Sequence, residues 1–147
     1  MDCAFFPYGL KSKEFLIKRC IYLIEYLKNK CDKIIIACNT LSLLVLPLIS
    51  DYYENVYGVF DSLRININEK SVIIGSKMTI DLIKLDYSND CIDGTLLINS
   101  IQNNLNYTEM INEINDNIEK YSNIILACTH FLKLKDNSFI INEIRNK

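Results

Sequence analysis

The sequence predicts an α/β fold built from parallel strands that alternate with helices, and three observations lead to this prediction. Residues 34–37 form a continuous apolar run, which is typical of a strand buried on both faces. A second run of this kind covers residues 124–127, near the other end of the chain. Segments with apolar residues at helical spacing lie between the short apolar runs. We therefore expect two small lobes, each a parallel sheet flanked by helices.

The first half of the chain should open with a Pro7-Tyr8-Gly9 turn, followed by Ser12, a good helix N-cap. In chain order, the elements expected before residue 62 are a helix over residues 13–29, a strand over 33–37, a helix from Asn39 or Thr40 to about Ser50, a strand over 56–60 and a short helix capped by Asp61. Pro47 falls inside the second of these helices and predicts a kink or an early end.

The polar stretch 66–70 is the best candidate for a domain boundary. We therefore expect a first lobe over residues 1–69, a second over 70–135 and a C-terminal tail over 136–147. In chain order, the elements expected in the second half are a strand over residues 71–75, a helix over 79–85, a polar and turn-rich link over 86–90, helices over 95–102 and 107–121, a strand over 124–127 and a terminal helix over 139–145.

Composition argues against several classes of protein. The formal net charge of −2 is unlike the basic footprint of a nucleic-acid-binding protein, and no apolar run is long enough to span a membrane. The six cysteines form no CxxC pair and only one histidine is present, so we expect no metal site. Without a recognisable secretory signal, we expect a cytoplasmic protein with reduced thiols.

Two cysteines follow the two most apolar strands. Cys38 precedes Asn39 and Thr40, and Cys128 precedes Thr129 and His130. Ligands of open α/β sheets bind beyond the carboxyl ends of the strands, so each cysteine stands where a site is expected. The plain alternative is a pair of buried structural thiols, since free cysteine is often buried. Two cysteines at matched strand ends favour the functional interpretation.

Two thiols on opposite lobes suit proton transfer at a carbon atom, with one thiolate removing a proton and the other thiol returning one. A cysteine pKa of ~8.5 needs only a modest depression to give thiolate at neutral pH, and a helix N-terminus favours that shift. Asn39, Thr40 and Thr129 offer polar groups beside the thiols. His130 is positioned to exchange a proton with Cys128 or to orient a substrate.

Five motifs occur in a fixed order along nearly the whole chain. They are Asp2-x-Ala4-x-x-Pro7-Tyr8-Gly9-x-Lys11-Ser12, Cys38-Asn39-Thr40, Tyr57-Gly58-Val59, Gly75-Ser76-x-x-Thr79-Ile80 and Cys128-Thr129-His130. With this ordered set the chain resembles the aspartate/glutamate racemase superfamily, and most of all the glutamate racemases. Any one of these short motifs is weak evidence, and the strength lies in their order.

The resemblance implies two flavodoxin-like lobes and a cofactor-independent enzyme that interconverts L- and D-glutamate, in preference to aspartate, for peptidoglycan synthesis. It implies that Cys38 acts on one enantiomer and Cys128 on the other, with His130 assisting Cys128. The residues expected to hold this small amino-acid substrate are Pro7, Tyr8, Gly9, Asn39, Thr40 and Thr129.

The chain also departs from the family pattern. The family opens with a strand ending in an Asp-Ser-Gly-type motif, a helix and a second strand, and Met1-Asp2 matches only the end of that second strand. Phe131-Leu132 replaces the usual aromatic-Pro step, and the return of the chain to the first lobe is reduced to about one helix. We therefore expect an incomplete first lobe with a bare strand edge, which predicts a homo-oligomer or a complementing chain.

Three functions follow from these observations. The first is a glutamate racemase-like isomerase. The second is a non-catalytic remnant, or a fragment that needs a complementing segment, which keeps the scaffold and binds a partner or a dicarboxylic amino acid. The third is another member of the superfamily, such as a hydantoin racemase or a decarboxylase. The Pro7-Tyr8-Gly9 segment favours the first function over the third.

Overall fold

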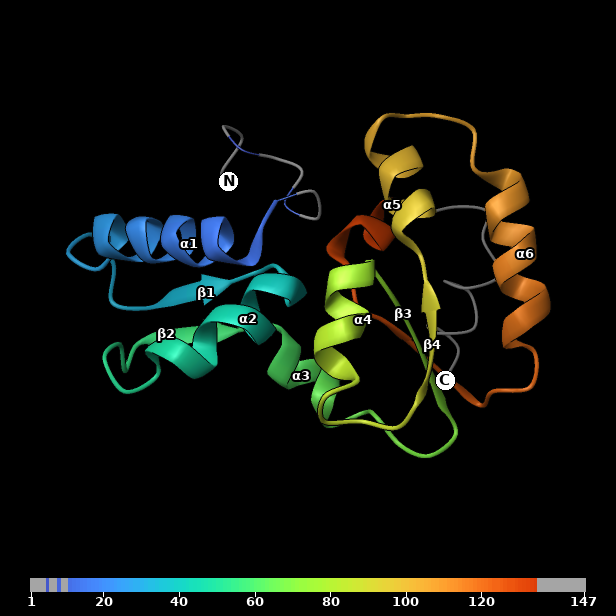
Figure 1. Ribbon diagram of the computed structural model, residues 1–147, viewed down its shortest axis with the longest axis horizontal. Helices are drawn as coiled ribbons and strands as arrows, with labels where there is room; N and C mark the ends of the chain where they lie inside the picture. Colours follow the sequence, from blue (N-terminus) through green and yellow to red (C-terminus); the bar gives the residue numbers. More distant parts are fainter. Residues whose placement is uncertain (1–4, 6–7, 9–10, 135–147) are drawn as a thin grey trace. The chain divides into compact units, whose positions relative to one another are not determined.

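The computed structural model describes residues 5, 8 and 11–134, which form an α/β fold in two compact units that divide between Asp61 and Ser62 (Figure 1). The division falls within helix α3 (Phe60–Arg64), a few residues before the polar stretch 66–70. The terminal helix expected over 139–145 lies outside the described residues. Within the described part of the chain, no helix has the length and apolar character needed to cross a membrane.

The first unit is a two-stranded parallel sheet with helices against it. Its elements are α1 (Lys13–Leu27), β1 (Ile34–Ile36), α2 (Asn39–Ile49) and β2 (Val56–Gly58). The strands pair in parallel, with Ile34 opposite Val56 and Ile36 opposite Gly58. Helix α1 packs against α2, and α2 packs against both strands (Figure 1).

Helix α1 begins where the sequence predicts. The Ser12 hydroxyl accepts a hydrogen bond of 3.2 Å from the backbone N–H of Phe15, which satisfies one of the unpaired donors at the helix start. Leu16, Cys20 and Ile24 recur at helical spacing and form its buried face. Burial of this apolar stripe, rather than intrinsic propensity alone, holds the helix in place.

The sequence predicted either a kink or an early end of helix α2 at Pro47, and the early end does not occur. It runs to Ile49, and the N–H of Ser50 still donates to the carbonyl of Leu46 at 3.0 Å. Proline removes only its own N–H, so a proline in the last turn costs one helical hydrogen bond.

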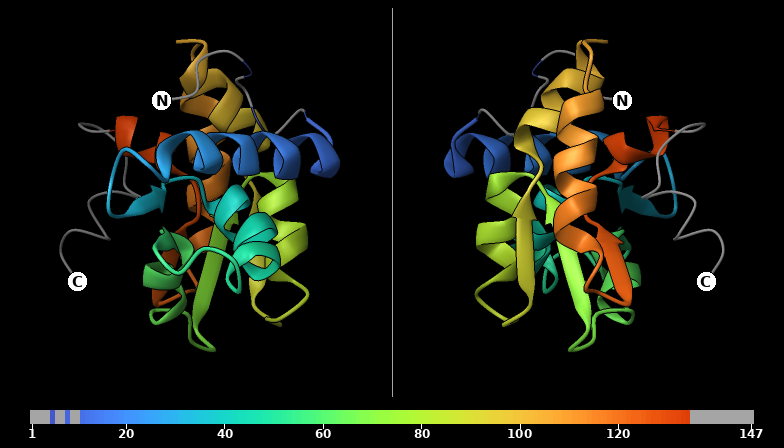
Figure 2. Two further views of the ribbon diagram at one scale, coloured as in Figure 1. Left: turned by 90° about the vertical axis from the view of Figure 1, so that its left-hand side faces the viewer. Right: turned by 90° about the vertical axis from the view of Figure 1, so that its right-hand side faces the viewer.

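The second unit is a three-stranded parallel sheet in the order β4-β3-β5. In chain order its elements after α3 are β3 (Ser71–Gly75), α4 (Lys77–Ile83), β4 (Asp90–Asp93), α5 (Thr95–Gln102), α6 (Thr108–Ile118), β5 (Asn123–Leu126) and the 3-10 helix η2 (Thr129–Lys133). The right-hand view of Figure 2 shows these strands side by side, with α6 in front of them.

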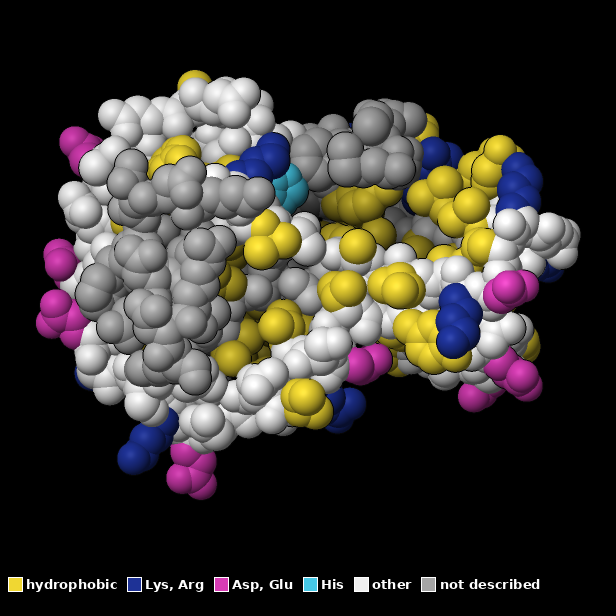
Figure 3. Space-filling view, turned by 180° about the vertical axis from the view of Figure 1, so that it is seen from behind, with side chains coloured by type: hydrophobic (Ala, Val, Ile, Leu, Met, Phe, Trp, Pro, Cys, Tyr) yellow, Lys and Arg dark blue, Asp and Glu magenta, His cyan; other side chains and the backbone are white. Residues whose placement is uncertain are grey.

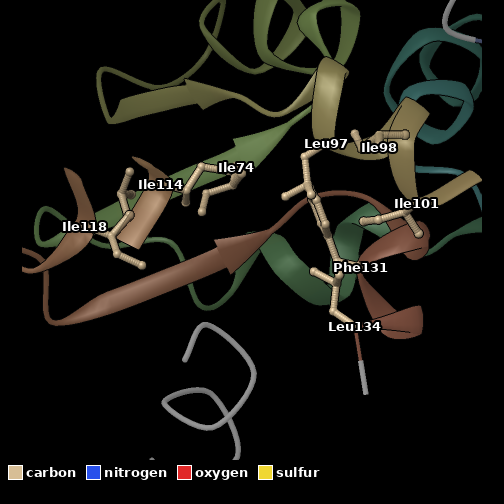
Figure 4. Packing of buried hydrophobic residues seen from close by; sticks show 9 residues of the cluster. Ile74, Leu97, Ile98, Ile101, Ile114, Ile118, Phe131 and Leu134 are labelled. Atoms are coloured by element: carbon tan, nitrogen blue, oxygen red, sulfur yellow. The ribbon is translucent and has the colours of Figure 1, made fainter. Parts of the chain in front are cut away.

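Strand β3 is the centre of this unit, and all of its residues are buried. A central parallel strand is covered on both faces, which explains its continuous apolar run. The core on one face of the sheet joins β3 to α5, α6 and η2 (Figure 4), and its buried members are Val72, Ile74, Leu97, Ile98, Ile101, Ile114, Ile118, Phe131 and Leu134. Leu97 of α5 and Phe131 of η2 point toward one another in this core (Figure 4).

Strand β4 is the one strand among the described residues that the sequence analysis missed. The sequence predicted only a polar link over residues 86–90, yet Asp90–Asp93 pairs along β3 from Val72 to Gly75. Only Ile92 in this strand is strongly apolar, so no hydrophobic pattern marks it. Pairing with β3 overrides the weak local signal, and exposed aspartates are common on edge strands because charges discourage further pairing.

Gly58 marks the closest approach of α2 to β2. A β-carbon built at this position would meet the side chain of Leu46 and would lie 2.8 Å from Cβ of Ser42. Ser42 belongs to the first turns of α2, so any larger residue at position 58 would push this helix start off the strand. At Gly75, by contrast, an added β-carbon would lie 3.4 Å from Cβ of Ala127, which is ordinary contact.

We predict that Gly58→Ala destabilises the protein by about 1–3 kcal/mol, because the overlap with α2 forces a backbone shift. Gly75→Ala is the matched control and should change the free energy of unfolding by less than about 1 kcal/mol. Urea unfolding followed by circular dichroism measures both variants. Equal stability of the two variants would show that α2 does not pack against β2 as described.

Candidate functional site

Each unit places a cysteine just beyond the carboxyl end of a parallel strand. Cys38 follows β1 and occupies the N-cap position of α2, while Cys128 follows β5 and occupies the N-cap position of η2. Both cysteines are partly buried, and neither forms a disulfide with a described residue. We describe the surroundings of each cysteine within its own unit.

Hydrogen bonds tie the backbone at Cys38 to the start of α2. Its carbonyl accepts from the backbone N–H of Ser42 at 2.8 Å and from the Ser42 hydroxyl at 2.9 Å. The same hydroxyl lies 3.0 Å from the carbonyl of Ile36, the last residue of β1. Ser42 thus links the strand end and the first helical turn, and this fixes the backbone that carries the thiol.

Asn39 has a buried side-chain oxygen that lacks a hydrogen-bond partner among the described residues. The residue is only 5% exposed. An unsatisfied buried acceptor costs about 1–3 kcal/mol, so such atoms in native proteins call for an explanation such as a ligand or a water. Thr40, the next residue, is also buried. Asn39 therefore offers an acceptor for a hydrogen-bond donor at the N-terminus of α2.

Cys20 of α1 is a second thiol, and its pKa depends in part on the charge of Cys38. Burial, and to a smaller extent the nearby charge of an ionised Cys38, together raise the pKa of Cys20 to about 11. Cys20 is 5% exposed and faces the core with Leu16 and Ile24. At neutral pH it therefore stays a protonated, shielded thiol, and it offers no competing nucleophile beside Cys38.

The ladder between β3 and β5 positions Cys128. The N–H of Ala127 donates to the carbonyl of Ile74 at 2.8 Å, which brings the Gly75-Ser76 turn beside the Ala127-Cys128 step. The sulfur of Cys128 lies 3.5 Å from Nδ1 of His130. Sequence analysis placed these two side chains two residues apart, and the structure brings them within hydrogen-bonding distance.

Burial lowers the pKa of His130, and the positive charge of Lys133 lowers it further. The imidazole is therefore neutral at pH 7. A neutral imidazole carries one donor and one acceptor nitrogen, so Nδ1 is able to accept the Cys128 proton or to donate to its thiolate, depending on the tautomer.

A polar cluster at the same edge of the sheet was absent from the sequence analysis. The carboxylate of Asp93 accepts hydrogen bonds from the Thr95 N–H at 2.9 Å and the Thr95 hydroxyl at 2.6 Å, and the N–H of Lys77 donates to that hydroxyl at 2.9 Å. The cluster joins the starts of α4 and α5. The Asp-x-Thr spacing is a known turn signal, but it carried no information while β4 was unrecognised.

The remaining predicted site residues fall in three groups. Tyr8 is partly buried, and its carbonyl accepts from the N–H of Lys11 at 3.0 Å. Thr129 is exposed at the start of η2. Pro7 and Gly9 lie outside the described residues. Among the described residues, no three His, Cys, Asp or Glu side chains are grouped so that they could hold a metal ion.

Comparisons with known proteins point to one kind of enzyme. No family model matches the chain. The glutamate racemase of Campylobacter jejuni is 28% identical over 151 residues, which cover 88% of this chain and 60% of that protein. The glutamate racemase of Aliivibrio fischeri is 31% identical over 157 residues, covering 92% and 59%. The chain thus spans about three fifths of the length of the curated relatives it matches.

Solved structures give the same result for the fold. The crystal structure of the C. jejuni glutamate racemase superposes with a TM-score of 0.71 at 28% identity, covering 89% of this chain and 61% of that one. The glutamate racemase from Thermus thermophilus superposes with a TM-score of 0.72 at 23% identity, covering 91% and 57%, which supports the fold alone. In sequence and in fold, the chain is therefore similar to glutamate racemases over about three fifths of their length.

Proposed function

We propose that the chain carries the two proton-transfer groups of a cofactor-independent amino-acid racemase that interconverts L- and D-glutamate. One observation carries the proposal: Cys128, with His130 at 3.5 Å from its sulfur, follows strand β5 in the same way that Cys38 follows β1. The similarity to glutamate racemases supports glutamate as the substrate. In this proposal, the two thiols face opposite sides of the bound substrate.

The proposed reaction moves one proton off the α-carbon and another onto it. The thiolate of one cysteine takes the α-proton, which leaves the bonding electron pair on the α-carbon and the adjacent carboxylate. The thiol of the other cysteine then donates its proton to the opposite face, and the configuration inverts. Each turnover exchanges the protonation states of the two cysteines, so Cys38 starts on one enantiomer and Cys128 on the other.

Substrate binding in this proposal uses the start of α2. Backbone N–H groups in the first turn of a helix have no intrahelical acceptor, and the helix dipole attracts an anion there, which suits a substrate carboxylate. The unpartnered oxygen of Asn39 then accepts from the substrate ammonium. Thr40, Thr129 and the Pro7-Tyr8-Gly9 segment complete the proposed set of substrate contacts.

A neutral His130 fits the role proposed for it. It accepts the proton of the Cys128 thiol, which leaves the thiolate that acts as the base, and it returns this proton after Cys128 has donated its own to a substrate and is again a thiolate. An imidazolium could not accept this proton, so the lowered pKa of His130 extends the working range toward acid. The biological role that we attach to this chemistry is the supply of D-glutamate for peptidoglycan synthesis in the cytoplasm.

The chain matches only about 60% of the length of its relatives, and this partial match suggests a second candidate function. It is a racemase-like scaffold that binds a dicarboxylic amino acid, or a partner, without inverting a substrate. Asn39 would accept the ammonium group in either case. The two candidates therefore differ in proton exchange at the α-carbon, and not in ligand binding.

We predict that the protein exchanges the α-proton of both L- and D-glutamate for deuterium in heavy water. Cys38→Ser and Cys128→Ser should each lower racemisation by at least about 100-fold, because serine is far less acidic than cysteine. Each variant should retain exchange on one enantiomer at most. Proton NMR of the α-position, together with chiral analysis of the products, measures both quantities.

Cys31→Ser, at an exposed cysteine, is the control and should keep full activity. Full racemisation by either active-site variant would exclude the two-thiol mechanism. Saturable glutamate binding without any exchange by the unaltered protein would favour the second candidate.

We also predict a pH effect on stability that depends on His130. Because the folded protein lowers the pKa of His130, the unfolded chain binds more protons between the folded pKa and the unfolded value of ~6.5. This contribution to stability is therefore complete above pH ~6.5 and is lost as the pH falls toward the folded pKa. The melting temperature of the unaltered protein relative to His130→Asn should fall between pH 7.5 and pH 5.5. A constant difference across that range would argue against a buried, neutral His130.

A further inference from the structure

Ser42 makes a hydrogen bond outside its own helix. In the first turns of α2, its hydroxyl lies 2.9 Å from the carbonyl of Cys38 and 3.0 Å from the carbonyl of Ile36, the last residue of β1. A helical serine often bonds to the carbonyl four residues back, so the bond to Cys38 alone would carry no information. The bond to Ile36 is different, because it reaches past the helix start into the strand.

Burial makes this bridge costly to lose. The first unit exposes many side chains, hydrophobic ones among them (right-hand part of Figure 3), yet Ser42 is only 3% exposed. A buried hydroxyl is unfavourable unless it is hydrogen-bonded. Apart from Ser42, the helix is apolar from Leu41 to Ile49. The carbonyls of Ile36 and Cys38 are the partners that satisfy the hydroxyl in these surroundings.

Gly58 of β2 leaves the room that this serine occupies. A β-carbon at position 58 would lie 2.8 Å from both Cβ and Oγ of Ser42, so a larger residue there would displace the serine or the strand. The next residue, Val59, donates its N–H to the same carbonyl of Ile36 at 3.2 Å. The Tyr57-Gly58-Val59 motif thus brings β2 and Ser42 together at the carboxyl end of β1.

The two bridged carbonyls belong to the peptide groups on either side of Ala37 and Cys38. The carbonyl of Ile36 shares its peptide with the N–H of Ala37, and the carbonyl of Cys38 shares its peptide with the N–H of Asn39. One hydroxyl therefore fixes this segment at both ends. Cys38 has the extended backbone of an N-cap residue, with φ −101° and ψ 121°, but its side chain makes no capping hydrogen bond. The thiol is thus held through the backbone and not by a bond of its own.

We propose that Ser42 is a positioning residue for Cys38, and that Gly58 makes this role possible by leaving room for the serine. The inference rests on the proposed function, in which the Cys38 thiolate removes the α-proton of a substrate. The N–H groups in the first turn of α2 have no helical acceptor, and the helix dipole there favours a thiolate. By fixing the peptide groups around Cys38, the Ser42 hydroxyl keeps the sulfur beside these N–H groups.

Alkylation of each cysteine tests the proposal without any substrate. Iodoacetamide reacts with thiolates, and mass spectrometry of the peptides gives the rate at each cysteine separately. Ser42→Ala removes the hydroxyl, while the N–H groups of residues 42 and 59 still donate to the same two carbonyls. At pH 7, Cys38 in this variant should react about two- to fivefold more slowly than in the unaltered protein, as expected for a lost helix-dipole interaction.

The pH profile separates this role from a purely structural one. At pH ~9.5, above the ordinary cysteine pKa of ~8.5, a thiol is ionised with or without the helix, so the two rates should converge. Cys20 of α1, whose pKa depends in part on the charge of Cys38, stays protonated at both pH values because its pKa is about 11. A difference of the same size at both pH values would overturn the proposal, since it would reflect access to the thiol and not its ionisation.

Two other thiols and a second serine provide the controls. Cys20 is 5% exposed in the same unit, so it should stay unreactive in Ser42→Ala. A reactive Cys20 would show that the unit has opened, and this would contradict a positioning role. Cys128, in the other unit, should react at an unchanged rate. Ser100→Ala removes a hydroxyl that is 6% exposed in α5, and it should leave the rate at Cys38 unchanged.

Gly58→Ala tests the second half of the proposal. It should slow the alkylation of Cys38 at pH 7 by a similar factor, because the added methyl group takes the space of Ser42. An unchanged rate in this variant would overturn the role of Gly58, and an unchanged rate in Ser42→Ala would overturn the role of Ser42. Failure of the proposed function would look different, because the unaltered protein would then exchange no α-proton of glutamate, whereas the alkylation rates need no substrate.

Discussion

Parallel pairing of short strands is the constraint on which the candidate site depends. Parallel strands bring their carboxyl ends to one edge of a sheet, so residues far apart in the chain become neighbours there. In the second unit, the bond of 2.8 Å between Ala127 and Ile74 carries this register to the last step before Cys128. Central strand β3 is buried along its whole length and is bonded on both sides, which makes that register well determined.

In the first unit, parallel pairing also positions the cysteine, but fewer strands take part in the sheet. Among the described strands, only β2 pairs with β1, and the backbone at Cys38 is held through Ser42, which bridges the strand end and α2. Full burial of an isoleucine contributes about 1.5–3 kcal/mol, and Ile35 is left 67% exposed. A whole domain has a net stability of only ~5–15 kcal/mol, so this exposure is a substantial share.

Sequence reasoning succeeded where a local pattern and the tertiary structure agree. The apolar run of β3 is continuous because the strand is buried along its whole length and paired on both sides, and Ser12 caps α1 through its own hydroxyl. The expectation that β1 is buried on both faces is wrong at Ile35, whose side chain is 67% exposed. It failed at β4, where only Ile92 carries a hydrophobic signal and pairing with β3 supplies the rest. The Asp93–Thr95–Lys77 cluster could not be predicted either, because Asp93 is the last residue of that strand.

The candidate site divides in the same way. The positions of Cys38 and Cys128 beyond strand ends follow from the sequence, since an apolar run and its polar successor mark a strand end. The unpartnered oxygen of Asn39 and the lowered pKa of His130 do not, because both arise mainly from burial in the folded chain. Burial of this kind depends on packing, which no local spacing encodes.

Native-state amide hydrogen exchange tests the central claim that the two ladders differ in strength. The N–H groups of Val72 to Ile74 should exchange only through global unfolding. Those of Ile34 and Ile36 should exchange faster, through local opening of the ladder between β1 and β2. Equal, slow exchange of both strands would contradict the account, because β1 would then be as firmly held as β3.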